Sequence, residues 1–175
     1  MKGVTRILLL PLFAVVALAA GTPSTPPEFT HRDAHDWINS DPLTLASLKG
    51  KVVLVEFWAF ECDNCIKSRA WIESLKADES AGLVIIGVHT PELPKERDVR
   101  AVHLAVERAG IHYPVMIDGD ASYWNALHIQ YWPTFCLIGR DGRLYASVPG
   151  EMDVGNDRAQ KVKEAIELML KQPAT

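Results

Sequence analysis

Two of the three cysteines in this 175-residue chain, Cys62 and Cys65, are separated by two residues, where an apolar run gives way to a polar, helix-like segment. At the start of a helix, the first thiol of such a pair lies near unpaired backbone N–H groups and the positive end of the helix dipole, so its thiolate is stabilised. The second thiol follows about one turn later and can close a disulfide. The spacing predicts a redox pair, in which Cys62 attacks a disulfide and Cys65 resolves the mixed disulfide.

The main alternatives for this pair are half of a structural zinc site and an inert structural disulfide. Structural zinc usually takes about four ligands, and no second cysteine pair or close Cys/His pair accompanies this one. A disulfide closed over two residues removes little chain entropy, so it stabilises a fold only weakly. Redox chemistry therefore explains the pair better, and we expect neither a metal nor a cofactor.

Residues 1–21 have the order of charge and hydropathy of a secretory signal peptide. Lys2 and Arg6 precede an apolar run over 7–18, which ends in small residues at 19–21. The apolar run is shorter than the roughly 20 residues that cross a bilayer, so cleavage is favoured over a permanent membrane anchor. We expect an exported, periplasmic protein.

Composition divides the rest of the chain into two parts. Residues 22–30 are proline-rich with few apolar side chains, which predicts a flexible linker, and residues 31–172 have the length of one domain. The chain has 18 basic and 22 acidic residues, and the signal segment holds two of the basic ones. This negative balance disfavours nucleic acid or an anionic membrane as a partner.

Apolar patterning predicts the elements that position the cysteines. Residues 51–58 and 83–89 are continuous β-rich runs on either side of a helix over 66–77, which predicts a parallel βαβ unit with a right-handed crossover. The runs 134–138 and 143–148 are joined by a Gly-rich turn and predict an antiparallel hairpin.

Further elements complete the predicted layers. Helical spacing predicts helices over 31–38, 99–109, 121–127 and 156–170, and residues 114–117 predict a short strand. Together these elements predict an α/β fold with a mixed central sheet and helices on both faces. Reaction centres of such sheets lie at the C-terminal edge of the parallel strands, where the cysteine pair falls.

The order of these elements resembles the thioredoxin superfamily, in which a strand, Trp-Ala-x-x-Cys-x-x-Cys and a helix follow one another. The sequence here is Trp58-Ala-Phe-Glu-Cys62-Asp-Asn-Cys65, and the later Trp132-Pro133-Thr134 matches the superfamily's cis-proline loop. The phrases over 48–55 and 87–92 are similar to exported TlpA-like redoxins, especially to the thioredoxin-like domain of DipZ-type proteins. The Gly-Pro of thioredoxin between the cysteines is replaced by Asp-Asn.

The resemblance implies roles for two residues besides the cysteines. Glu56 lies in an otherwise apolar strand, where the family commonly places a buried carboxylate; burial would raise its pKa and let it exchange a proton with Cys65. The alternative is a strand-end glutamate in water. Pro133 is expected to have a cis peptide bond, to lie against the cysteine pair, and to expose neighbouring backbone for pairing with a substrate.

The resemblance also implies candidate substrate-binding residues. Trp58 and Trp132 are expected to frame the site, with Thr134 beside them, although aromatic residues at strand ends commonly serve packing alone. The third cysteine, Cys136, lies in an apolar run and is interpreted as a small buried hydrophobe.

These observations predict an exported, monomeric thiol-disulfide oxidoreductase that exchanges its disulfide with protein thiols and receives electrons from a membrane or periplasmic donor. Asp63 adds a negative charge beside Cys62 that opposes thiolate formation, which favours a reductant over an oxidant. Two alternatives stay open. One is a copper carrier that uses both cysteines and a histidine, and the other is a thiol peroxidase, whose usual Pro-x-x-x-Thr-x-x-Cys pattern is missing.

Overall fold

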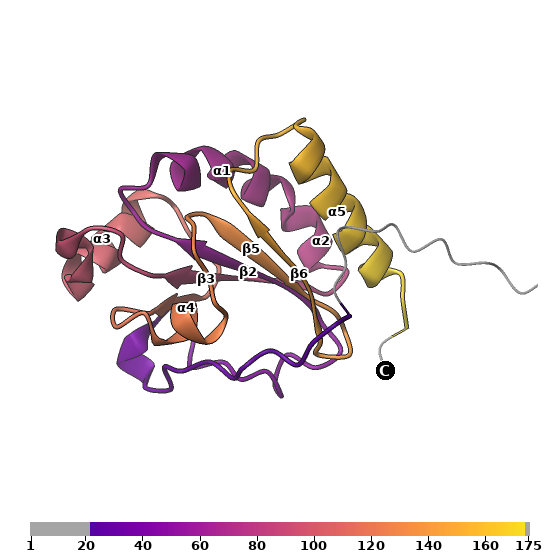
Figure 1. The fold of residues 1–175 in the computed structure, drawn as a ribbon, viewed down its shortest axis with the longest axis horizontal. Coiled ribbons are helices and arrows are strands. Elements are labelled where there is room, and N and C mark those ends of the chain that lie inside the picture. The colour runs from indigo at the N-terminus through magenta and orange to yellow at the C-terminus, as the bar shows by residue number, and fades with distance from the viewer. Residues whose placement is uncertain (1–21, 174–175) are drawn as a thin grey trace, which may run out of the picture.

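The structure is a computed structural model and describes residues 22–173. The fold is built around one mixed sheet (Figure 1). Six strands have the spatial order β1-β4-β3-β2-β5-β6. Strands β2, β3 and β4 are parallel, whereas β1, β5 and β6 each run antiparallel to their neighbour. The strand bounds are Trp37–Ile38 (β1), Val52–Trp58 (β2), Leu83–His89 (β3), Val115–Ile117 (β4), Thr134–Ile138 (β5) and Leu144–Pro149 (β6).

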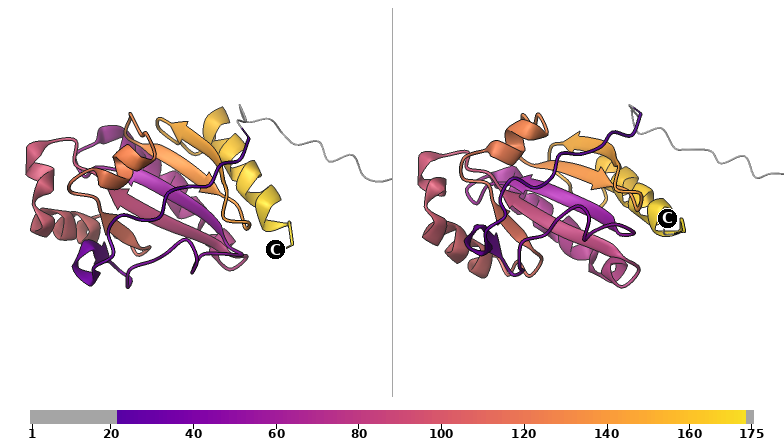
Figure 2. Two further views of the ribbon diagram at one scale, coloured as in Figure 1. Left: turned by 60° about the horizontal axis from the view of Figure 1, so that its bottom comes forward. Right: turned by 90° about the horizontal axis from the view of Figure 1, so that it is seen from below.

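Helices α1, α3 and α5 pack on one face of the sheet, and α4 lies on the other face together with the N-terminal segment (Figures 1 and 2). The predicted α/β fold, the parallel βαβ unit and the antiparallel hairpin are confirmed. The helix bounds are Asp63–Ser74 (α1), Lys76–Glu79 (α2), Val99–Arg108 (α3), Ser122–Ala126 (α4) and Asp157–Leu170 (α5), with 3-10 turns at Ala34–Asp36 (η1) and Pro94–Arg97 (η2).

Strand β2 is buried along its whole length, which is why its sequence is continuously apolar apart from Glu56. Successive side chains alternate between the sheet faces, so Val55 and Phe57 contact the α4 side. Leu54 contacts the side of α1 and α5. The last residue of β2, Trp58, leads into the loop that carries Cys62.

Residues 22–30 are not the flexible linker that their composition predicts. The backbone of Ser24 pairs with that of Leu144 at the outer strand β6, with N···O distances of 3.1 and 2.8 Å. Phe29 is only 1% exposed, and its ring lies 5.1 Å from that of Tyr123. One buried aromatic ring and one backbone bridge are enough to hold a segment whose average composition is polar.

The predicted helix over 31–38 is also wrong. The structure has the short turn η1 followed by β1, in which Trp37 is antiparallel to Met116 of β4. Trp37 and Ile38 are adjacent and both buried. The free edge of β4 supplies backbone partners to this segment, which local helical spacing does not reveal.

No helix within residues 22–173 is long and apolar enough to cross a bilayer. The predicted signal segment, residues 1–21, lies outside the described residues.

Replacing Phe29 by alanine tests whether the N-terminal segment belongs to the folded domain. We expect the free energy of unfolding to fall by about 3 kcal/mol, because the ring is fully buried. Urea unfolding of the protein measures this. Val154→Ala, at a side chain that is 68% exposed, is the control and should change stability by less than about 0.5 kcal/mol. Equal stability of both variants would contradict the packed position of Phe29.

Candidate active site

The two cysteines lie at the start of α1, at the C-terminal edge of the parallel strands, as predicted. Cys62 is the N-cap residue of α1, and its sulfur accepts a hydrogen bond from the backbone N–H of Cys65 at 3.2 Å. The two residues form a disulfide with a Cα–Cα distance of 5.3 Å. Cys62 is 7% exposed and Cys65 only 1%, so Cys62 offers the more accessible sulfur.

The loop before Cys62 is held by a carboxylate, Glu96, that no periodic pattern of residues singles out. Glu96 is buried, and one of its oxygens accepts the N–H of Glu61 at 2.8 Å. The other accepts the N–H groups of Glu92 and Leu93, at 2.8 and 2.7 Å. A single side chain thus joins the β2–α1 loop to the segment after β3.

Glu56 is buried in β2 and is not a strand-end residue in water. Burial raises its pKa from 4.5 to about 7 because the charged form is desolvated. Two groups oppose this shift and lower the pKa: the Tyr113 hydroxyl, which donates a hydrogen bond to Glu56 Oε2 at 3.1 Å, and the positive charge of Arg69. At neutral pH the carboxyl is therefore poised between its two protonation states.

The groups around Glu56 come from distant parts of the chain. Tyr113 precedes β4, and Arg69 lies on α1 with its guanidinium carbon 5.8 Å from the centre of the Trp58 ring. Gly87 of β3 leaves the necessary space. A Cβ there would lie 2.9 Å from Trp58 Nε1 and 3.2 Å from the Tyr113 ring, which is too close for either side chain to keep its place.

His89 ends β3 within the same layer. Its ring is fully buried, stacked on Phe60 with centroids 5.4 Å apart and edge-on to Trp58 at 5.1 Å. Neither ring nitrogen has a hydrogen-bond partner. Burial lowers the pKa of His89 to about 4, so the imidazole is neutral at pH 7 and acts here as an aromatic packing group.

The predicted cis peptide bond between Trp132 and Pro133 is confirmed. The Trp132 ring stacks on Trp124 with centroids 4.0 Å apart, and its indole N–H donates to the carbonyl of Thr90 at 2.9 Å. Among the hydrogen bonds of residues 22–173, none uses the amide or the carbonyl of Trp132. Thr134 directs its hydroxyl to the carbonyl of Tyr131 at 2.7 Å.

One apolar cluster brings most of the predicted residues together. Trp58 and both cysteines belong to it, and Trp132 packs against it. The side chains of Trp58 and Thr134 are covered, at 1% and 3% exposure, which fits packing beneath the site. Trp132 is half-buried, so its ring and backbone remain available at the surface.

The copper-carrier alternative lacks a third ligand in this arrangement. Within the part of the chain that the structure describes, two groups of side chains lie close enough to hold a metal, and neither includes a cysteine: His31 with Asp118 and Asp120, and Asp33 with His35 and Asp36. Cys136 is buried on the other sheet face, where desolvation raises its pKa to about 11. It fits the interpretation as a small hydrophobe.

Sequence comparisons agree with the geometry. A family model described as Redoxin matches residues 22–166. The chain is 38% identical over 132 residues to the protein SUPPRESSOR OF QUENCHING 1, chloroplastic, of Arabidopsis thaliana, a match that covers 74% of the chain and 12% of the relative. It is 36% identical over 124 residues to Protein DipZ of Mycobacterium bovis, covering 67% of the chain and 17% of the relative. The chain thus spans a small part of these two proteins.

A third relative is similar over most of its own length. Thiol-disulfide oxidoreductase ResA of Bacillus subtilis is 30% identical over 130 residues, which cover 74% of the chain and 68% of the relative. Among solved structures, a DsbE-type thiol:disulfide interchange protein from Chlorobium tepidum superposes with a TM-score of 0.71, covering 86% of this chain and 98% of that one. At 18% identity this likeness supports the thioredoxin-like fold alone.

The raised pKa of Glu56 predicts a pH-dependent effect of Glu56→Gln on stability. Because the folded-state pKa lies above the unfolded value, the stability linked to the protonated carboxyl is present at low pH and is lost as the pH rises from about 4.5 through about 7. Glutamine cannot ionise. Relative to wild type, the variant should therefore gain up to about 3 kcal/mol between pH 4 and pH 8, measured by urea unfolding. Glu79→Gln, at an exposed carboxyl, should show a constant difference, and a constant difference for Glu56→Gln would contradict the shift.

Proposed function

Because this chain belongs to the redoxin family of thioredoxin-like proteins, we propose that it is a thiol-disulfide oxidoreductase that exchanges the Cys62–Cys65 disulfide with cysteines of partner proteins. The observation that carries the proposal is the asymmetry of the pair. Cys62 caps α1 and is the more exposed sulfur, whereas Cys65 is buried one turn later. This arrangement suits the two roles in the exchange. The nucleophile must reach the partner protein, and the resolving thiol must be kept away from the partner.

The exchange begins with the reduced pair. The Cys62 thiolate attacks one sulfur of a partner disulfide, a mixed disulfide forms, and the other partner sulfur leaves as a thiolate that takes a proton. Cys65 then loses its proton and attacks Cys62, which releases the second partner thiol. Two electrons pass from the chain to the partner, and the Cys62–Cys65 disulfide remains.

We propose that Glu56 accepts the proton that Cys65 loses before it attacks Cys62. A general base works best when its pKa lies near the working pH, and the pKa of Glu56 is about 7. The Tyr113 hydroxyl fixes the orientation of the acceptor carboxyl. Glu56 in β2 and Cys65 in the first turn of α1 are both buried, which supports proton transfer away from bulk water.

The cis-proline loop is the proposed binding surface for the partner chain. The unused amide and carbonyl of Trp132 offer one β-type pairing position next to Pro133. The half-buried Trp132 ring frames this position, while Trp58 and Thr134 support it from within. We propose that the protein acts as an exported monomer, which the signal-like residues 1–21 support, with a membrane or periplasmic donor that reduces it again.

Cysteine variants test the exchange and the order of attack. We expect the wild-type protein to catalyse the reduction of insulin disulfides by dithiothreitol. Reduced Cys65→Ser, freed of dithiothreitol before insulin is added, should retain the partner as a stable mixed disulfide on Cys62. Cys62→Ser should hold no partner. Cys136→Ser is the matched control and should keep full activity, because that thiol is buried on the other sheet face. Activity that survives in Cys62→Ser would refute the proposal.

The redox potential tests the proposed direction. Asp63 destabilises the Cys62 thiolate and with it the reduced form, so we expect a potential below about −200 mV, measured against glutathione. Asp63→Asn should shift the potential about 10 to 30 mV toward oxidising values. Glu79→Gln, which removes the same charge at an exposed residue near the start of β3, at the opposite edge of the sheet, should leave the potential unchanged. A wild-type value near −120 mV would show an oxidant instead.

A further inference from the structure

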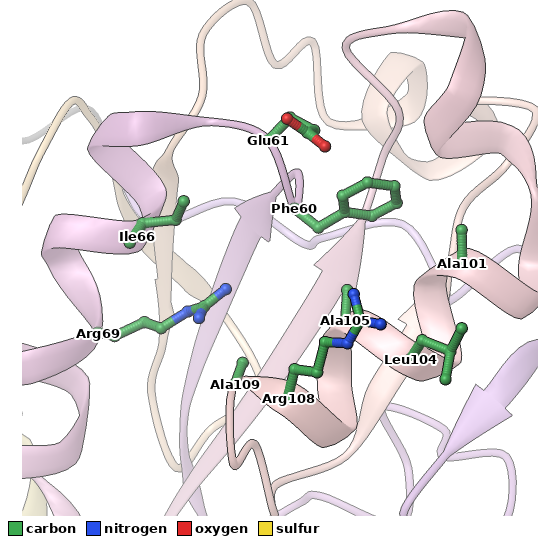
Figure 3. Close-up of a pocket in the computed structure, with 9 residues that line it drawn as sticks. All are labelled: Phe60, Glu61, Ile66, Arg69, Ala101, Leu104, Ala105, Arg108 and Ala109. Carbon is green, nitrogen blue, oxygen red and sulfur yellow. The ribbon is translucent and has the colours of Figure 1, made fainter.

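A groove between α1 and α3 lies beside the cysteine pair and has no part in the exchange steps above (Figure 3). We call it the α1–α3 groove. Its volume is about 320 Å³, and it opens to solvent. At one end it is lined by Phe60 and Glu61, the two residues that precede Cys62. The groove therefore begins where a partner bound to Cys62 would have to lie.

The walls of the groove expose apolar surface. Ile66 of α1 and Leu104 of α3 are 44% and 49% exposed, which is high for large aliphatic side chains. Between them, α3 presents small residues at every fourth position, Ala101, Ala105 and Ala109. These positions share one face of the helix, so a bound chain can approach the α3 backbone closely.

The other end of the groove carries two arginines, one of which, Arg69, lies with its guanidinium over the Trp58 ring. Arg69 extends from α1 toward α3, and Arg108 stands on the α3 side (Figure 3). Within residues 22–173, neither guanidinium takes part in an ion pair, and neither appears as a side-chain donor in any hydrogen bond. Glu61, the one carboxylate in the lining, is paired with Lys95 at 2.9 Å and does not neutralise them.

This positive charge contrasts with the net charge of the whole chain, which has 22 acidic and 18 basic residues. Two cations beside exposed aliphatic side chains are complementary to a carboxylate next to an apolar residue. We propose that the α1–α3 groove docks an acidic, apolar segment of the partner protein whose cysteine reacts at Cys62. This inference rests on the proposed exchange function and adds a rule for partner choice.

The geometry sets the position of the acidic residue in that segment. Arg69 follows Cys62 by seven residues, which corresponds to about 10 Å along a helix. An extended chain covers this distance in about three residues. The carboxylate is therefore expected about three or four residues from the partner cysteine.

Two synthetic peptides test the docking. In each peptide, a central cysteine forms a mixed disulfide with 2-thiopyridine. The variable positions are the third and fourth residues on both sides of this cysteine, and leucines flank them. The acidic probe has glutamate at those positions, and the neutral probe has glutamine. We expect the reduced wild-type protein to react about tenfold faster with the acidic probe, and the preference to disappear near 1 M salt, where the Debye length falls to about 3 Å.

Arg108→Glu should abolish the preference for the acidic probe. We choose Arg108 and not Arg69 for this test because Arg69 also lowers the pKa of Glu56, so its replacement would affect the proposed proton acceptor as well. Arg100→Glu makes the same charge change at an exposed position of α3 outside the groove and should keep the preference. Reaction with the small neutral 2,2′-dipyridyl disulfide should be the same in all three proteins, which shows that the cysteine pair is intact.

Retention of the preference in Arg108→Glu, or its equal loss in Arg100→Glu, would overturn the proposal. Failure of the wild-type protein to react with dipyridyl disulfide would refute the exchange function instead. In that case, binding of the cysteine-free acidic peptide is measured by the NMR shifts of the α3 amides. Shifts in wild type that vanish in Arg108→Glu would support the groove as a docking site, and an absence of shifts would refute it.

Discussion

The complete burial of β2 is the constraint on which the other elements depend. All seven residues of this strand are covered, so both sheet faces need a packed layer. One layer consists of α1, α3 and α5, and the other combines α4 with a largely irregular segment that includes Phe29. The end of β2 then emerges between two layers, and Cys62 follows it at a rigid edge.

Three buried carboxylates shape that edge. Glu96 holds the loop before Cys62, and Glu56 is buried in β2, the strand that leads into that loop. Asp118, after β4, accepts the N–H of Trp124 and the hydroxyl of Thr90, each within 3.0 Å. Both of these residues contact Trp132, so the position of the cis-proline loop depends on Asp118. Buried carboxylates need hydrogen-bond donors, and here most of the donors belong to the loops around the site.

Local patterns were sufficient for most of the fold. The continuous apolar runs of β2 and β3 identified a parallel unit, and the cysteine spacing identified a helix start at Cys62. The same reasoning failed for the segment before residue 39. A flexible linker and a helix were expected there, but Phe29 is a core residue and β1 pairs with β4. Composition averages hide a single buried ring, and edge pairing depends on a strand that is remote in sequence.

Residue types and spacing alone identify the candidate reactive groups: a thiol pair at a helix start, a carboxyl in an apolar strand and a proline that matches a cis-proline loop. Periodicity and spacing carry this information because helix caps and strand alternation are local. The surroundings of these groups depend on contacts between segments that are remote in sequence. Arg69 and Arg108 line one groove because α1 and α3 pack on the same face of the sheet, and Tyr113, which precedes strand β4, donates a hydrogen bond to Glu56 of β2. Desolvation and charge pairing arise from such contacts, and the order of residues along the chain does not specify them.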